Sequence, residues 1–98
     1  MNDQRSVRPP VVVLFGGPSA EHDVSIVSGS AIADALAADG FTVRQVVIDL
    51  AGGWWWLPTD HARGVRAAAD YDHPATLGAN GPFRVGAALD RLAAERPA

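Results

Sequence analysis

The chain has 98 residues, 48% of them hydrophobic, and its 8 basic and 11 acidic residues give a formal net charge of −3 at pH 7. This size and composition predict one small soluble globular domain with a single core, and the acidic balance disfavours nucleic-acid binding, which needs a basic surface. The sequence contains no cysteine, which excludes disulfides and thiolate metal sites and is compatible with a cytoplasmic protein.

The first predicted element is a buried strand. Residues 1–10 are polar and predict a flexible tail, whereas residues 11–15, VVVLF, are apolar throughout. Such a run is typical of a strand in a parallel sheet that is covered on both faces. It is far shorter than the roughly 20 residues that span a membrane, so neither a membrane-spanning nor a targeting segment is expected.

A helix is expected directly after Gly16 and Gly17, which end the strand. Ser19 is a candidate N-cap, whose side-chain oxygen can accept from a backbone N–H two or three residues on. From Val24 onward, small and apolar residues recur at spacings of three and four and predict one buried stripe, made of Val24, Val27, Ala31, Ala35 and Ala38. Gly40 followed by Phe41 predicts a Schellman-type end of this helix.

A second strand is predicted over residues 42–50. Strand, helix and strand joined by short connections form a right-handed βαβ unit, so a parallel sheet is expected. The segment GGWWWL, residues 52–57, predicts a short aromatic strand in a tryptophan-rich hairpin. Asp49 is interpreted as a strand-end residue and not as a ribose ligand, because no G-x-G-x-x-G motif precedes it.

The last third of the chain carries weaker signals. Residues 59–82 are expected to be mostly loop with at most one brief element, and the Asp-His pairs at 60–61 and 72–73 are interpreted as surface polar residues, not metal ligands. A final helix is predicted to run to about Arg96, with a buried face formed by Val85, Leu89, Leu92 and Ala93. Arg91 and Glu95, one turn apart, are expected to pair on its solvated face.

These elements define a fold class: a small Rossmann-like α/β domain over residues 11–98, with a βαβ unit, helices packed on the sheet and a tryptophan-rich hairpin. In such folds, ligands bind in the crevice at the carboxyl ends of the strands. Here the crevice is formed by a glycine pair and a helix N-terminus, whose free N–H groups attract carboxylate or phosphate. The chain contains no lysine and no P-loop motif, which excludes a P-loop nucleotide site.

Glu21 stands at the start of the helix, beside this crevice, and has two interpretations. Its carboxylate can bind an ammonium group while the helix N-terminus binds a carboxylate, a combination that suits an amino acid. Alternatively, Glu21 and Asp23 only stabilise the helix through its macrodipole, which contributes about 0.3 to 1 kcal/mol for each acid.

The stretch VVVLFGGPSAEHDVSIVSGSAIADAL, residues 11–36, resembles the start of the D-alanine–D-alanine ligases. That family opens with an apolar strand, a glycine pair, a small-residue turn and a Glu-x-[Glu/Asp]-Val-Ser run. The likeness is looser through GGWWWL, and over residues 58–98 it is limited to length and general character. It implies the N-terminal, pre-ATP-grasp domain of a cytoplasmic enzyme of the ATP-grasp superfamily, which joins two D-alanines through an acyl phosphate for peptidoglycan synthesis.

The resemblance also implies roles for individual residues. Glu21 matches the catalytic-site glutamate that orients the first D-alanine through its ammonium group. Val24 falls near the substrate methyl group, although simple helix packing explains it equally well, and Gly16 and Gly17 give the substrate room. His22 occupies a variable position and is expected to be solvated.

The resemblance also implies that Asp23 and Ser25 complete the motif as scaffold residues. It further implies that this sequence lacks other parts of a ligase. ATP and Mg²⁺ are expected to bind to ligase domains absent from this chain, and the chain itself is expected to hold no metal and to be inactive alone. The acceptor, whether D-alanine, D-lactate or D-serine, stays open.

The expected partners are D-alanine, the remaining ligase domains or a complementary chain, and a second copy in a dimer. Self-association is expected because a sheet without its next strand leaves an unpaired edge and exposed apolar surface. Two alternatives remain: a stand-alone, non-catalytic α/β binding module or partner subunit, and an unrelated small Rossmann-like protein.

Overall fold

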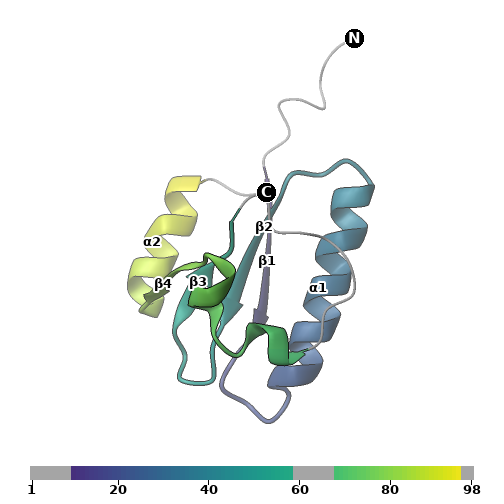
Figure 1. Cartoon of the computed structure of the whole chain (residues 1–98). Helices are drawn as coiled ribbons and strands as arrows, with labels where there is room; N and C mark the ends of the chain where they lie inside the picture. The colour runs from purple at the N-terminus through teal and green to yellow at the C-terminus, as the bar shows by residue number, and fades with distance from the viewer. Residues whose placement is uncertain (1–9, 59–67, 96–98) are drawn as a thin grey trace.

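The computed structural model describes residues 10–58 and 68–95, and Figure 1 shows a sheet with one long helix on each side. The first nine residues of the predicted tail, the Asp60–His61 pair and the predicted helix end at Arg96 lie outside the described residues. The helices and strands follow in the order β1 (Val11–Gly16), α1 (His22–Ala38), β2 (Val43–Ile48), β3 (Trp54–Trp56), β4 (Asn80–Phe83) and α2 (Val85–Glu95). Two 3₁₀ turns, η2 (Ala68–Tyr71) and η3 (Pro74–Leu77), precede β4.

The four described strands form a mixed sheet in the order β1-β2-β3-β4. β1 and β2 are parallel, with Val11 opposite Val43 and Gly16 opposite Ile48. β3 is antiparallel to both β2 and β4. The predicted α/β fold with a βαβ unit and a tryptophan-rich hairpin is therefore confirmed, and the parallel pairing is confined to β1 and β2.

Helix α1 packs on the sheet with a different face from the predicted stripe. Its buried residues are His22, Ile26, Gly29, Ser30 and Ala33. The predicted stripe lies on the opposite side, where Val24 is 61% and Val27 50% exposed. The apolar pattern of α1 continues around both sides, so periodicity alone could not identify the buried one.

Gly29 explains which face of α1 meets the sheet. A Cβ at this position would collide with the Phe15 side chain, at 2.7 Å from its Cγ. Because glycine has no side chain, helix and strand approach each other closely at this point. An alanine here, with its Cβ, would prevent this approach.

The C-terminal end of α1 matches its prediction fully, and the N-terminal end matches only in part. Gly40 has φ of +93°, the Phe41 N–H donates to the Leu36 carbonyl at 3.1 Å, and the Gly40 N–H donates to Ala37 at 3.1 Å, which together form the expected Schellman motif. At the other end, the Ser19 hydroxyl accepts from the Glu21 N–H at 3.1 Å, as expected. The N-cap position itself, however, belongs to Glu21.

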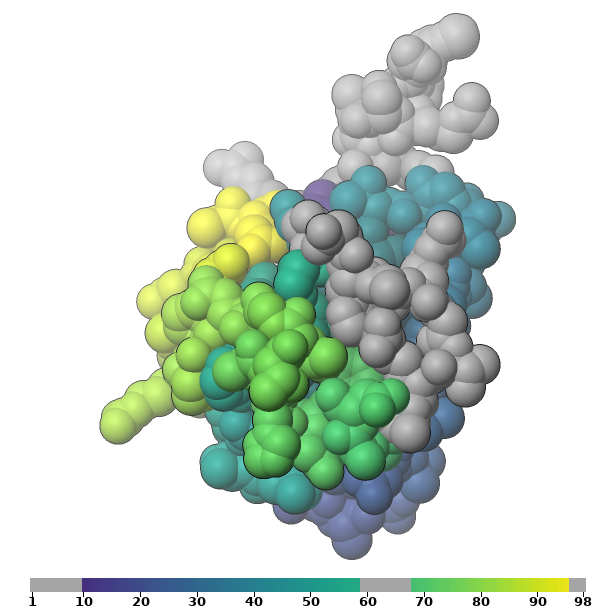
Figure 2. Space-filling view, in the orientation of Figure 1, coloured from purple at the N-terminus to yellow at the C-terminus, as the bar shows by residue number. Residues whose placement is uncertain are grey.

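The segment before α2 has more structure than the predicted single brief element. In Figure 2, residues 68–83 (green) lie across the front of the molecule, between α2 and the start of α1. Tyr71 is only 2% exposed, and its ring meets Phe15 edge to face with ring centroids 5.6 Å apart. This single tyrosine closes the core on the α1 side of the sheet.

Helix α2 covers the other side of the sheet, and the predicted buried face was correct only for Leu92, which is partly buried against the core. Its Ala88 is buried and belongs to a cluster with Val46 and Trp56, whereas Val85 is 56% and Leu89 53% exposed. The bulky Trp56 leaves room at the contact for only a small residue. Neither α1 nor α2, nor any other helix in the described part of the chain, is long and apolar enough to cross a membrane.

Candidate functional site

The turn after β1 lies at the carboxyl end of the parallel strands, where the crevice is predicted. Gly16 has φ of +94°, and a Cβ there would collide with the Ile48 carbonyl oxygen of the neighbouring strand, so only glycine fits. Gly17 has φ of +105°, and a Cβ there would meet no atom within 4 Å. The space beside Gly17 is therefore open. A residue that leaves room for a ligand needs such open space beside it.

Two side chains from α1 hold this turn. The Ser25 hydroxyl accepts from the Gly16 N–H at 2.9 Å, which agrees with its expected scaffold role. His22 lies at 2.6 Å through Nδ1 from the Gly17 carbonyl, and because a carbonyl only accepts, Nδ1 carries the proton and donates. His22 is 5% exposed, so the expectation of a solvated histidine was wrong: the first turn of α1 directs this side chain inward.

Glu21, Asp23 and Val24 lie at the start of α1 and are exposed. Glu21 is the N-cap residue, and its carbonyl accepts from the Ser25 N–H at 2.9 Å while its side chain makes no capping hydrogen bond. The Glu21 carboxylate is therefore not used to cap the helix. The His22 amide donates to the Ser19 carbonyl at 3.1 Å, so the amides that the helix start leaves for a negatively charged ligand group are those of Asp23 and Val24.

Asp49 closes the turn that follows β2. Its Oδ1 accepts from the Ala51 and Gly53 amides at 2.9 and 2.8 Å, and its Oδ2 accepts from the Trp55 indole at 2.9 Å. Burial by itself would raise the pKa of Asp49, but the hydrogen bonds from the indole and the turn amides outweigh it and lower the pKa below its ordinary value. Both oxygens are engaged, so Asp49 shapes the hairpin, in agreement with its interpretation as a strand-end residue.

A hollow of about 320 Å³ lies at this end of the sheet, lined by His22, Asp49, Leu50, Ala51, Tyr71 and Asp72. None of the predicted site residues, Gly16, Gly17, Glu21 and Val24, is among these lining residues; Glu21 precedes the lining residue His22 in the chain. The carboxylates of Asp49 and Asp72 line the hollow, and no arginine is among its lining residues. The site therefore favours a ligand with a positively charged group.

The sequence missed two residues of this hollow. Tyr71 lies in a segment that was expected to be mostly loop, and nothing in its surroundings indicated a buried position. His22 carried a usable signal, because it precedes the buried Ile26 by four residues and so shares its helix face.

The residues of this site do not fit a magnesium-nucleotide complex. Within residues 10–58 and 68–95, no group of three or more His, Asp or Glu side chains is placed to hold a metal ion. The chain also contains no lysine to pair with phosphates.

The chain is a small α/β domain with a hollow near the carboxyl ends of its parallel strands. Residues 10–91 match the family model for the D-ala D-ala ligase N-terminus, and the chain belongs to this family.

Curated relatives carry the same name. The D-alanine–D-alanine ligase of Methylobacterium sp. (strain 4-46) is 49% identical over 51 residues, which are 52% of this chain and 13% of the relative. Those of Heliobacterium modesticaldum and Ruegeria pomeroyi are 41% identical over 49 residues and 60% over 38 residues. These two matches cover 50% and 39% of this chain, and 13% and 12% of the relatives. The chain thus matches only a small part of the length of these ligases.

Proposed function

We propose that this chain is the single N-terminal, substrate-binding domain, residues 11–98, of a D-alanine–D-alanine ligase, and that its crevice recognises the first D-alanine. The observation that carries the proposal is the turn at Gly16 and Gly17 facing the N-terminus of α1, with the Glu21 carboxylate uncommitted. In this arrangement the α1 N-terminus attracts the carboxylate of the amino acid, and Glu21 binds its ammonium group.

The roles of the neighbouring residues follow from their positions. Gly17 leaves open space for the substrate, and the exposed Val24 offers an apolar contact for its methyl group. His22 and Ser25 hold the glycine turn in place and so position the crevice without touching the substrate.

The remaining steps of the ligation belong to parts of the ligase beyond this chain. ATP and Mg²⁺, bound by other parts of a ligase, would supply the activation of the first D-alanine as an acyl phosphate, and we expect residues 1–98 by themselves to be inactive. The reaction would serve peptidoglycan synthesis in the cytoplasm. We also propose that copies of the chain associate as a dimer, because β1 is an edge of the described sheet and α1 carries exposed apolar residues.

A chimera tests the role of Glu21. Residues 10–91 of this chain replace the corresponding segment of the Methylobacterium ligase, and ADP release is measured against D-alanine concentration. Glu21→Gln removes one charge-assisted interaction of about 1.5 to 3 kcal/mol, so we expect kcat/KM for D-alanine to fall about 10- to 100-fold.

Asp23→Asn is the matched control, because it removes the same charge from the same exposed helix turn. It should leave kcat/KM within about threefold of the parent chimera, since exposed substitutions outside a site change free energies by about 0.5 kcal/mol or less. A Glu21→Gln chimera as active as its parent would contradict the proposed role. An active parent chimera in which both variants lose activity equally would show a general charge effect instead.

A further inference from the structure

A second hollow lies at the opposite end of the sheet from the D-alanine crevice. Its volume is about 310 Å³, and its lining residues are Arg44, Trp56, Leu57, Pro58, Gly78, Asn80, Arg91 and Glu95. The strand register fixes its distance from the crevice: Arg44 pairs with Val12 near the start of β1, whereas the crevice begins at Gly16. The proposed D-alanine site uses none of these lining residues.

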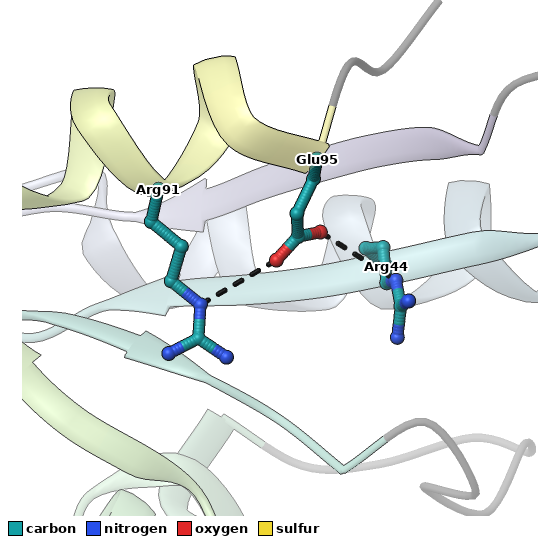
Figure 3. A network of polar contacts seen from close by, with 3 residues as sticks. All are labelled: Arg44, Arg91 and Glu95. Carbon is teal, nitrogen blue, oxygen red and sulfur yellow. Dashed lines mark hydrogen bonds and ion pairs between the residues drawn. The ribbon is translucent and has the colours of Figure 1, made fainter.

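Glu95 holds two arginines side by side at this hollow. One carboxylate oxygen lies 3.5 Å from Nε of Arg44 on β2, and the other lies 3.4 Å from Nε of Arg91, one turn earlier on α2. Figure 3 shows that the ends of both guanidinium groups extend past the carboxylate, away from α2. Both contacts use Nε, so the terminal N–H groups of the two arginines are left for another partner.

The N···O distances of the two ion pairs are also long. Charge-assisted N–H···O bonds are ordinarily about 2.7 to 2.9 Å long, shorter than both contacts of Glu95. Arg44 and Arg91 keep 36% and 37% of their side-chain surface exposed, so a small solute can reach them. The sequence-based expectation of a solvated Arg91–Glu95 pair was therefore incomplete: the pair is partly covered and shares a second arginine.

Among the described residues, two buried donors and one buried acceptor around this hollow have no hydrogen-bond partner: Nε of Arg44, the Trp56 indole N–H and Oε1 of Glu95. Among its lining residues, two guanidinium groups, the Asn80 amide and the Trp56 indole can donate, and Glu95 supplies the only carboxylate. The Trp56 side chain is 95% covered, so its indole nitrogen is buried. This nitrogen has no hydrogen-bond partner among the described residues. A buried donor without an acceptor is costly and commonly indicates an absent water or ion.

Trp56 also fixes one of the arginines. The Arg91 guanidinium lies over its ring, 4.8 Å from the centroid, and 5.4 Å from that of Phe83. Stacking keeps the plane of the guanidinium group in a set orientation, which lowers the entropy lost when the group binds a ligand.

We propose that this hollow is a binding site for a small oxyanion, a carboxylate or phosphate group, held between the guanidinium groups of Arg44 and Arg91. The two arginines and Glu95 give the site a net charge of +1, although the whole chain carries −3. Planar guanidinium groups bind two oxygens of one anion at a time, which suits both carboxylate and phosphate.

An NMR titration of the full ¹⁵N-labelled chain tests this site. Inorganic phosphate, and in a second series acetate, replaces chloride at constant ionic strength, and the indole signal of Trp56 and the Nε–H signals of Arg44 and Arg91 are followed. We expect saturable shifts at these groups in the millimolar range for phosphate, for acetate or for both. Saturation by only one anion identifies the chemistry of the ligand.

Three variants separate binding from structure. Arg44→Gln should weaken the affinity at least about tenfold, because it removes one of two charged ligands. Glu95→Gln should strengthen it severalfold, because the anion no longer competes with the carboxylate. Arg84→Gln removes a charge from an exposed residue outside the hollow and should leave the affinity unchanged.

Several results would overturn the site: shifts that stay linear for both anions, equal affinity in Arg44→Gln, or weaker binding in Glu95→Gln. The last outcome would mean that Glu95 and the arginines only attach α2 to the sheet. If Arg44→Gln does not fold, the Glu95→Gln titration still decides.

Discussion

Asp49 is a single side chain that organises the whole hairpin between β2 and β3. Its two oxygens together accept three hydrogen bonds, two from backbone amides of the turn and one from Trp55. An Asn side chain has one oxygen and one NH₂ group, so it cannot reproduce the acceptor that faces the indole. The hairpin therefore depends on the carboxylate itself.

We predict that Asp49→Asn lowers the free energy of unfolding by about 1 to 2 kcal/mol at pH 7, because the partly buried indole N–H of Trp55 loses its hydrogen-bond acceptor. The pKa of Asp49 is lower in the folded chain, so its stabilising effect is complete above the unfolded pKa of about 3.9 and is lost as pH falls through the lower folded pKa. The difference between parent and variant, measured by urea unfolding at about pH 7 and pH 3, should be smaller at pH 3, with the decrease confined to values below about pH 5.

Asp90→Asn provides the control for this series, since Asp90 is exposed on α2. It should change the unfolding free energy by about 0.5 kcal/mol or less at either pH. A difference between parent and Asp49→Asn that is the same at both pH values would refute the linkage to the Asp49 carboxylate.

Helix α1 illustrates what periodicity does not decide at the scale of an element. The sequence correctly predicted the helix and its Schellman end at Gly40, because these depend on local conformation. It selected the wrong buried face, because Val24 and Val27 are larger and more apolar than Gly29. The close approach of α1 to Phe15, a tertiary contact, overrides the hydrophobic pattern.

The outer face of α1, formed by Val24, Val27, Ala31 and Ala35, is apolar and exposed. We predict that Val27→Asp weakens the proposed dimer at least about tenfold in sedimentation experiments, because a charge placed in an apolar interface must be desolvated. Val85→Asp makes the same substitution at a similarly exposed valine on α2 and should leave the association unchanged. A parent chain that sediments as a monomer at high concentration would refute the dimer.

At the scale of the whole molecule, the sequence predicted most of the fold and part of the site. Local signals defined the β1 strand, the glycine turn and the Trp-rich hairpin, whereas the D-alanine crevice that the motif from Gly16 to Ser25 predicts stays a prediction. Tyr71, β4 and the contact of Arg44 with Glu95 could not be predicted, since each depends on contacts between segments far apart in the chain. Long-range packing leaves no periodic signature in such short elements.

The central claim, that the crevice at the carboxyl end of β1 recognises D-alanine, is tested most directly by titrating the ¹⁵N-labelled chain with D-alanine and, in parallel, L-alanine. We predict saturable amide shifts at Gly17 and in the first turn of α1 with D-alanine, weaker shifts with L-alanine, and their loss in Glu21→Gln. Shifts confined to other parts of the chain, no saturable shift, or identical titrations of the parent and Glu21→Gln would contradict the account.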